Sequence, residues 1–285
     1  MSAVMIDGRA VAARVRESVA AACTAFAAEA GRPPGLAVVL CGDNAASAVY
    51  VRNKGRAAER AGIRFDLHTP SAQSTTDDLL RLLAAIDADE EIDGVLVQLP
   101  LPGGIDAAAV VDAVSPGKDA DGFHPCNFGR LAAGSPGVVS PGTPAGCMQL
   151  LAAYDVPVAG RRAVVVGRST IVGRPLAAML TNADATVTVC HSKTPDLAAT
   201  CREADILVAA AGRPGLIDST HVKPGACVID VGTTPVDGAV RGDVDRESVE
   251  PVAGWLTPVP GGVGPMTIAM LLQNTVALAR ARRGV

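Results

Sequence analysis

A regular alternation of short apolar runs and longer amphipathic segments is the feature that most constrains the fold of this chain. Apolar residues recur three or four positions apart from Val11 to Phe26, which predicts an opening helix that ends before Gly31. Short β-rich runs and helical patterns then follow one another. The predicted elements are a strand over 36–40, a helix over 45–61, a strand over 63–68, a helix over 75–87, a strand over 94–99 and a helix over 106–114. This alternation indicates parallel βαβ units.

A stretch rich in Gly, Pro and Ser, residues 134–142, interrupts the alternation and predicts a linker. The pattern then restarts. Its elements are a helix over 144–154, strands over 162–166, 185–190, 206–210 and 226–231, helices over 173–181 and 195–202, and a final helix over 267–282. We therefore expect two α/β domains, residues 1–138 and 139–265, followed by a terminal helix within 266–285.

Composition excludes several classes of function. The 285 residues suffice for two ordinary domains. A net charge of −4 and an aromatic content of 2% argue against a nucleic-acid partner. The apolar runs are too short to span a bilayer and no secretory signal opens the chain, so we expect no membrane association and a cytoplasmic location. The seven cysteines lack the paired spacing of zinc sites, so we expect buried, reduced thiols and no metal.

The segment from Ala163 to Gly173 is an apolar strand that runs through a glycine-containing turn into a predicted helix. In dinucleotide-binding folds, such a turn lets the backbone approach the pyrophosphate at the helix N-terminus. The spacing departs from G-x-G-x-x-G, because Ser169 stands at the middle glycine position and Gly173 comes one residue late. Taken alone, the pattern also fits a plain turn between strand and helix.

The next strand, over 186–190, bears on which dinucleotide binds. An NAD-binding fold places Asp or Glu after this strand, where it holds the ribose hydroxyl. Here the sequence is His191-Ser-Lys-Thr194, without an acid, and Arg168 is available from the glycine turn. Because Arg168 and Ser192 can hydrogen-bond a 2′-phosphate, the pattern favours NADP. A solvated turn is the alternative.

Three side chains on the predicted helix over 45–61 share one face: Ser47, Tyr50 and Lys54. The chain has only four lysines, and a surface helix that accepts several arginines keeps a lysine at position 54. An amine can be titrated where a guanidinium cannot, so Lys54 is a candidate catalytic group, with an ordinary solvated charge as the alternative. Gln98, at the end of an apolar strand, lies where open α/β sheets bind ligands, or it satisfies the backbone of a loop.

Two further segments carry candidate groups. The segment from Lys118 to Phe123 contains Asp119 and Asp121. It predicts either an Asp-rich turn or a site where a carboxylate binds a heterocycle with several hydrogen-bond donors. The segment 257–267 is made almost entirely of Gly, Pro and small residues. It predicts either backbone placed close to a large flat ligand or a rigid connector.

Six segments resemble, in the same order, the motifs of the bifunctional methylenetetrahydrofolate dehydrogenase/cyclohydrolase family. They read YVRNKG at 50–55, VQLPLP at 97–102, KDADGF at 118–123, GRSTIVG at 167–173, HSKT at 191–194 and PVPGGVGPMT at 258–267. The resemblance implies a folate-binding N-terminal domain, a Rossmann-type NADP-binding domain, a terminal helix that packs back on the first domain, and a homodimer. It implies NADP-dependent oxidation of 5,10-methylenetetrahydrofolate and hydrolysis of the product to 10-formyltetrahydrofolate, a step in one-carbon metabolism and purine biosynthesis.

The resemblance also implies roles for individual residues. Lys54 and Gln98 would serve the cyclohydrolase step, Asp121 would hold the pterin and Tyr50 would stack on the aminobenzoyl ring. The other residues implied to bind folate are Val97, Leu99, Pro260, Gly261 and Gly262, and those implied to bind NADP are Gly167, Arg168, Ser169, Ser192 and Thr233. Two positions depart from the family: Gly142 stands where Cys is common, and Thr233 where an aliphatic residue is usual.

Two alternatives stay open beside this hypothesis. A two-domain NADP dehydrogenase of the shikimate type also uses a lysine and an aspartate, although Gln98 and the Gly/Pro segment at 258–267 speak against it. A dinucleotide-binding protein without catalysis is the other, although the retained Lys54, Gln98 and Asp121 speak against it.

Overall fold

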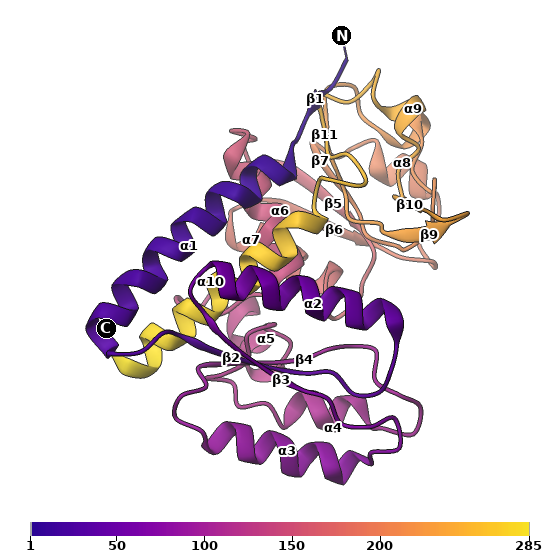
Figure 1. Cartoon of the computed structure of the whole chain (residues 1–285). Coiled ribbons are helices and arrows are strands. Elements are labelled where there is room, and N and C mark those ends of the chain that lie inside the picture. Colours follow the sequence, from indigo (N-terminus) through magenta and orange to yellow (C-terminus); the bar gives the residue numbers. More distant parts are fainter. Residues whose placement is uncertain (1, 285) are drawn as a thin grey trace. The chain divides into compact units, whose positions relative to one another are not determined.

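The computed structural model describes residues 2–284 and divides into two compact units. The three-stranded unit comprises residues 14–130, 136–140 and 271–284, and the six-stranded unit comprises residues 2–13, 131–135 and 141–270. Helices α1 (Gly8–Ala30) and α10 (Gly264–Arg283) belong in part to each unit. Figure 1 shows the helices and strands of the two units.

The three-stranded unit is a parallel sheet in the order β3-β2-β4. The strands are β2 (Gly35–Val39), β3 (Arg64–His68) and β4 (Gly94–Val97), and the helices are α2 (Ala45–Arg60), α3 (Thr76–Ala88), α4 (Ala107–Asp112) and α5 (Pro125–Ala132). Every residue of β2 is buried, since successive side chains point to opposite faces and both faces are covered. One face packs on α1, α2 and α10, through residues such as Leu36 and Leu272. The other face packs on α3 and α4, through residues such as Val39 and Leu83.

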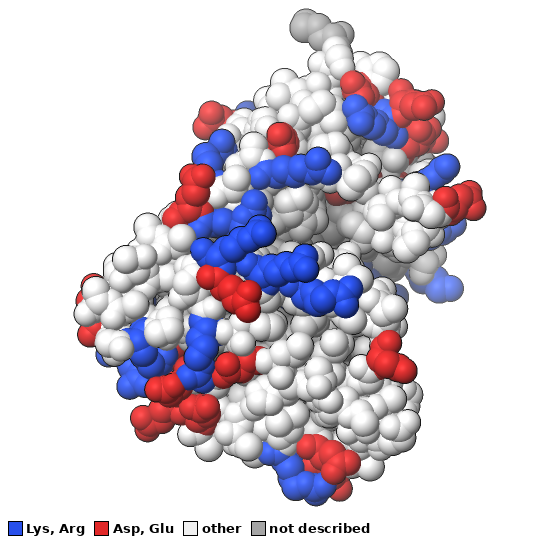
Figure 2. Space-filling view, in the orientation of Figure 1, with Lys and Arg blue, Asp and Glu red and all other residues white. Residues whose placement is uncertain are grey.

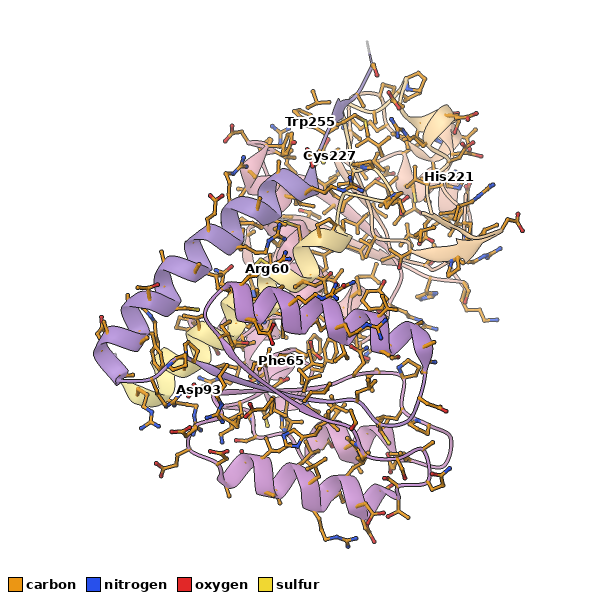
Figure 3. All side chains as sticks on the ribbon, in the orientation of Figure 1. Arg60, Phe65, Asp93, His221, Cys227 and Trp255 are labelled. Carbon is orange, nitrogen blue, oxygen red and sulfur yellow. The ribbon has the colours of Figure 1, made fainter. Side chains whose placement is uncertain are left out.

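An ion pair ties the amino ends of β2 and β4 together. Arg32 donates to both carboxylate oxygens of Asp93, at 2.7 and 2.8 Å, and the amide of Gly35 donates to the same carboxylate at 2.9 Å. The Asp93 side chain is fully buried (Figure 3). These contacts hold the amino ends of β2 and β4 in place relative to one another.

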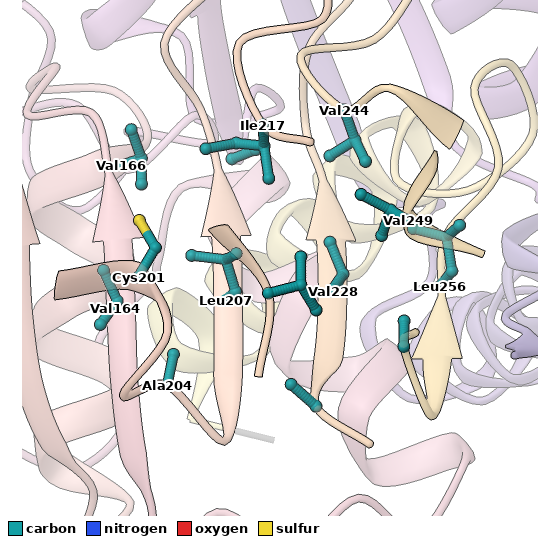
Figure 4. Close-up of a cluster of buried hydrophobic side chains, with 14 of the residues drawn as sticks. Val164, Val166, Cys201, Ala204, Leu207, Ile217, Val228, Val244, Val249 and Leu256 are labelled. Carbon is teal, nitrogen blue, oxygen red and sulfur yellow. The ribbon is translucent and has the colours of Figure 1, made fainter. Parts of the chain in front are cut away.

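The six-stranded unit is a parallel sheet in the order β1-β11-β8-β7-β5-β6. The strands are β1 (Val4–Met5), β5 (Arg162–Val166), β6 (Thr186–Cys190), β7 (Ile206–Ala209), β8 (Cys227–Asp230) and β11 (Trp255–Leu256). The helical segments are α6 (Gly142–Ala153), α7 (Gly173–Asn182), α8 (Leu197–Cys201), η1 (Ser219–His221) and α9 (Arg246–Val249), and β9 (Thr234–Val236) pairs with β10 (Ala239–Arg241) as a hairpin. On one side, residues such as Val164, Leu207 and Val228 pack against Cys201 and Val249 (Figure 4).

The strand order reverses at β5, because β6 lies on one side of it and β7 on the other. Open α/β sheets bind ligands at the carboxyl ends of the strands where the order reverses. The topology therefore points to the ends of β5 and β7 as the ligand-binding edge of this unit.

The predicted fold class, a two-domain α/β protein with parallel sheets and a terminal helix packed on the three-stranded sheet, is confirmed. Helix α5, strands β1 and β11, helix α9 and the β9–β10 hairpin have no counterpart among the predicted elements. Their short lengths leave too little periodicity to detect. The observed division also differs from the predicted domains at the start of the chain, because β1 pairs with β11 and joins residues 2–13 to the six-stranded unit.

Among residues 2–284, no helix combines the length and the apolar character needed to cross a bilayer.

Candidate active site

Helix α2 carries two of the predicted site residues. The side chain of Asn44 accepts a hydrogen bond from the amide of Ser47 at 3.0 Å and so begins the helix. Gly55 lets the helix lie close to β3, since a Cβ at this position would be 2.8 Å from the ring of Phe65 (Figure 3). This close approach turns Lys54 toward the interior and leaves Tyr50 56% exposed.

Lys54 is not an ordinary surface charge. Its side chain is buried, whereas Arg52, Arg56 and Arg60 on the same helix are exposed. Figure 2 shows basic side chains gathered over α2 on the face in view. On this helix the arginines are solvated and the lysine is buried. This difference favours a specific role for Lys54 over the alternative of an ordinary surface charge.

The structure brings Lys54 and Gln98 together. The Lys54 Nζ donates to Gln98 Oε1 at 2.9 Å, and Gln98 Nε2 donates to the carbonyl of Leu99 at 2.7 Å. Gln98 follows β4 directly, so it lies at the carboxyl end of a parallel strand. With its amide group engaged by the backbone, Gln98 presents its carbonyl oxygen to the amine. Val97, the last residue of β4, is buried, and Leu99 is half-buried.

Asp121 is half-buried in the turn that precedes α5. Burial raises its pKa to about 6, the positive charge of Lys54 lowers it and the negative charge of Asp119 raises it. The influence of Lys54 on this pKa means that the amine and the carboxyl group act on one another electrostatically. Lys54 and Gln98 are therefore joined by a hydrogen bond, and Asp121 feels the charge of Lys54 within the same three-stranded unit.

Two residues outside the predicted site build the Asp121 turn. The Asp119 carboxylate accepts hydrogen bonds from the amides of Gly122, Phe123 and His124 and from the side chain of Asn127. Asn274 of α10 donates to the carbonyl of Ala120 at 2.9 Å. In the sequence, Asn274 stands in a short polar run, Gln273-Asn274-Thr275, within the otherwise apolar pattern of the last helix.

Lys118 serves the fold, although its motif carries a predicted site residue. It is 1% exposed, and its Nζ donates to the carbonyls of Ile86, Asp87 and Asp89 at the end of α3. Unpaired carbonyls at a helix C-terminus attract a cation, so Lys118 closes α3.

The glycine turn after β5 is closely packed. Gly167 has φ of +135°, and a Cβ there would be 2.1 Å from the carbonyl oxygen of Ala210. A Cβ on Gly173 would be 2.1 Å from the carbonyl oxygen of Gly167. Ser169, in place of the middle glycine, accepts hydrogen bonds from the amides of Val172 and Gly173 at 3.1 and 3.3 Å. The departure from G-x-G-x-x-G thus keeps a tight turn at the start of α7.

This turn fits the pyrophosphate of a dinucleotide. Neither glycine could carry a side chain, since one on Gly167 would clash with Ala210 after β7 and one on Gly173 would clash with the carbonyl of Gly167. Within residues 2–284, the backbone amides of Ser169 and Thr170 donate to no protein acceptor. Helix α7 begins at Gly173, three residues after Thr170, and its N-terminus adds a favourable field for an anion.

Arg168 and Ser192 emerge from the same edge of the sheet. Val166 and Cys190 are register partners on β5 and β6, and each of the two residues follows its strand by the same number of positions. Both side chains are exposed, and the turn from His191 to Thr194 contains no acid. Thr233 follows β8 at the same edge and is also exposed.

The loop 257–263 packs on itself and on the start of α1. A Cβ on Gly262 would be 2.7 Å from both Pro258 O and Thr257 Cβ, and one on Gly8 would meet the Gly262 carbonyl. Gly261 has φ of +114°. Pro260, Gly261 and Gly262 belong to the six-stranded unit, whereas Lys54, Gln98 and Asp121 belong to the three-stranded unit.

Gly142, the first residue of α6, replaces a common family cysteine, and nothing in the structure assigns a further role to it. No group of three or more His, Cys, Asp or Glu side chains within residues 2–284 is arranged to hold a metal ion.

Comparison with known proteins identifies the family. Residues 6–121 match the model for the tetrahydrofolate dehydrogenase/cyclohydrolase catalytic domain, and residues 141–283 match that for the tetrahydrofolate dehydrogenase/cyclohydrolase NAD(P)-binding domain. The chain belongs to the tetrahydrofolate dehydrogenase/cyclohydrolase family.

Relatives span the whole chain. The bifunctional protein FolD of Oleidesulfovibrio alaskensis is 54% identical over 99% of this chain and 100% of its own. The bifunctional FolD methylenetetrahydrofolate dehydrogenase/cyclohydrolase of Campylobacter jejuni has a TM-score of 0.96 at 44% identity, over 99% of this chain and 100% of its own. The Trypanosoma brucei N5,N10-methylenetetrahydrofolate dehydrogenase-cyclohydrolase, solved with NADP cofactor and inhibitor, has a TM-score of 0.94 at 40% identity, over 100% of both chains.

Proposed function

We propose that this chain oxidises 5,10-methylenetetrahydrofolate with NADP and hydrolyses the resulting 5,10-methenyltetrahydrofolate to 10-formyltetrahydrofolate. The observation that carries the proposal is the part-buried Lys54–Gln98 hydrogen bond, whose amine acts on the pKa of Asp121. Membership of the dehydrogenase/cyclohydrolase family over both units agrees with it.

For the cyclohydrolase step, Lys54 is the group that moves a proton. Attack of water on the methenyl carbon forms the new C–O bond and releases a proton, which the Nζ can accept or relay. The adduct then breaks its C–N5 bond as the hydroxyl loses its proton and N5 takes one up, so that hydrolysis releases one proton overall. Gln98 Oε1 holds the amine in one orientation at 2.9 Å, so the proton acceptor is positioned before substrate arrives. A proton-transfer group placed in this way typically contributes a rate factor of about 10² to 10⁴.

Folate binding follows from the side chains around this pair. The Asp121 carboxylate would accept hydrogen bonds from the donor groups of the pterin, and the exposed ring of Tyr50 would stack on the aminobenzoyl ring. Val97 and Leu99 of the three-stranded unit would also contact the folate. The resemblance assigns a folate-binding role to the backbone of Pro260, Gly261 and Gly262 as well.

For the dehydrogenase step, NADP would supply the hydride acceptor, and residues of the six-stranded unit would hold it. The tight turn at Gly167 and Ser169 would bind the pyrophosphate through free amides and the start of α7. Arg168 and Ser192 would hold the 2′-phosphate, since both follow paired strands and no acid repels the phosphate. Thr233 would line the cofactor at the end of β8.

We also propose that the protein is a homodimer that pairs through β6. This strand is an edge of the six-stranded sheet, and it presents Thr186, Thr188 and Val189 to solvent without a charge or a proline. Such an edge is open to pairing with another chain. Light scattering after size-exclusion chromatography should give twice the chain mass, and Val189→Lys should give the monomer; a monomeric parent protein would contradict the proposal.

A cytoplasmic location fits the seven cysteines, all of which are free thiols.

The test of function is a coupled assay of both activities with NADP and with NAD. We expect 5,10-methylenetetrahydrofolate to reduce NADP and supplied methenyltetrahydrofolate to be hydrolysed. Turnover of shikimate without turnover of the folate would favour a shikimate-type dehydrogenase. NADP binding by calorimetry without folate binding or either activity would favour a non-catalytic binding protein.

A further inference from the structure

Two buried carboxyl groups at the carboxyl edge of the six-stranded sheet have no part in the function proposed above. Asp230 ends β8 and is 4% exposed, and Asp243 follows the β9–β10 hairpin and is fully buried. Burying two acids in one region costs free energy unless each is held by hydrogen bonds. The hydrogen bonds of Asp230 and Asp243 therefore indicate which backbone segments these two carboxyl groups hold in place.

Asp230 holds the backbone of the segment that carries Asp243. Its Oδ1 accepts from the amides of Gly232 and Asp243, both at 2.9 Å, and its Oδ2 accepts from the amide of Val244 at 3.0 Å. The fit is close, because a Cβ on Gly242 would be 1.8 Å from Asp230 Oδ2. Burial raises the pKa of Asp230 to about 6, these amides lower it and the charge of Asp243 raises it.

Asp243 in turn holds the loop that follows β7. Its Oδ2 accepts from the amide of Ala211 at 2.6 Å and from that of Gly212 at 2.9 Å. Its Oδ1 is buried without a hydrogen-bond partner in the part of the chain that the structure describes. Among the described residues, the backbone amides that donate to this carboxylate are those of Ala211 and Gly212 in the β7 loop.

The β7 loop lies against the glycine turn at the point where the strand order reverses. The carbonyl oxygen of Ala210 occupies the space into which a Cβ of Gly167 would project, 2.1 Å away. A displacement of residues 210–212 would therefore open or crowd the turn at Gly167. Because protein interiors are close-packed, a displacement of this kind is transmitted directly to its neighbours.

We propose that Asp243 is a positioning residue for NADP, which holds the β7 loop against the glycine turn through the amides of Ala211 and Gly212. This inference rests on the proposed NADP site. It assigns to Asp243 no contact with the cofactor, and its effect falls on cofactor affinity rather than on the chemistry at the folate.

The test compares three variants of the full-length protein. Asp243→Ala removes the acceptor, Asp243→Asn keeps one carbonyl oxygen but no charge, and Asp205→Ala is the matched control. Asp205 also accepts from a backbone amide, that of Arg162 at 3.0 Å, but at the amino edge of the same sheet. For each protein we would measure KM for NADP, kcat for the dehydrogenase, Kd for NADP by calorimetry, and hydrolysis of supplied methenyltetrahydrofolate, which needs no NADP.

We expect Asp243→Ala to raise KM and Kd for NADP about tenfold or more, as is typical of two buried donors that lose their acceptor. Asp243→Asn should fall between this variant and the parent protein, because charge-assisted hydrogen bonds are about twice as strong as neutral ones. Hydrolysis of methenyltetrahydrofolate and the Asp205→Ala variant should stay within about twofold of the parent protein.

Two results would overturn the inference. One is a folded Asp243→Ala protein that binds NADP as the parent does; the other is a loss shared equally by hydrolysis, which would mean a structural role alone. If Asp243→Ala does not fold, Asp243→Asn decides, and an unchanged Kd for NADP in that variant counts against the inference. Because calorimetry needs no turnover, a parent protein without dehydrogenase activity would contradict the proposed function and leave this comparison intact.

Discussion

At the scale of single residues, Lys54 is the side chain on which the proposed hydrolysis depends most directly. Lys54→Met keeps the length of the buried side chain but removes the amine that bonds Gln98. We expect hydrolysis of methenyltetrahydrofolate to fall about a hundredfold or more, with NADP binding unchanged. Arg52→Met, on the exposed face of the same helix, is the control and should behave as the parent protein. Unchanged hydrolysis in Lys54→Met would remove Lys54 from the mechanism.

Arg168 tests the choice of dinucleotide. Arg168→Ala removes a cation from the edge where the 2′-phosphate would lie, and NAD has no such phosphate. We expect Kd to rise about tenfold or more for NADP, as is typical of a lost hydrogen bond to a charged group, and much less for NAD. Arg202→Ala, at the end of α8, serves as the control. Equal losses for the two dinucleotides would contradict the assignment.

Asp121 predicts a pH dependence. Burial raises its pKa to about 6, so the carboxyl group is protonated below that pH and ionised above it. Only the ionised form accepts hydrogen bonds through both oxygens, so we expect KM for folate to rise as the pH falls through about 6. A KM profile across this range in parent and Asp121→Asn proteins measures the effect. The variant should show a higher KM without this pH dependence, and an identical slope in both proteins would assign it to another group.

At the scale of helices and strands, we expect the Arg32–Asp93 ion pair to stabilise the packing of β2 against β4. Arg32→Ala would remove both hydrogen bonds of the guanidinium to the buried Asp93 carboxylate, at the amino ends of β2 and β4, and leave only the Arg282 Nε, 3.9 Å from Asp93 Oδ1. Breaking a buried pair in this way typically costs about 3 to 5 kcal/mol. Urea unfolding followed by circular dichroism should report this loss. Arg81→Ala breaks the exposed pair with Asp78 and should change stability by less than about 1 kcal/mol.

At the scale of the whole molecule, the cysteines give a check on the packing of both units. Six of the seven thiols are buried, and only Cys126 is exposed. Burial raises the pKa of Cys23 to about 11 and that of Cys227 to about 12, and the thiolate is the reactive form. A chromogenic disulfide reagent should therefore titrate one thiol rapidly in the native protein and seven in denaturant. Rapid reaction of several thiols would contradict this packing.

The sequence by itself determined the fold class and the positions of the main elements. Short apolar runs, helical periodicity and turn residues are local signals, so the alternation that builds two parallel sheets can be recognised without tertiary contacts. The order of six motifs likewise pointed to the family. The short strands β1 and β11 could not be predicted in this way, because each has two residues and exists only through its pairing.

The tertiary structure decided which residues within a motif meet. Lys54 and Lys118 both belong to motifs, yet one bonds Gln98 and the other closes α3. No sequence pattern indicated the roles of Asp230 and Asp243, because a carboxylate that accepts hydrogen bonds from a distant loop produces no periodicity in the sequence. Contacts between residues far apart in the chain depend on how the elements pack. For this reason the hydrogen bond between Lys54 and Gln98, and those from the β7 loop to Asp243, could be identified only in the folded molecule.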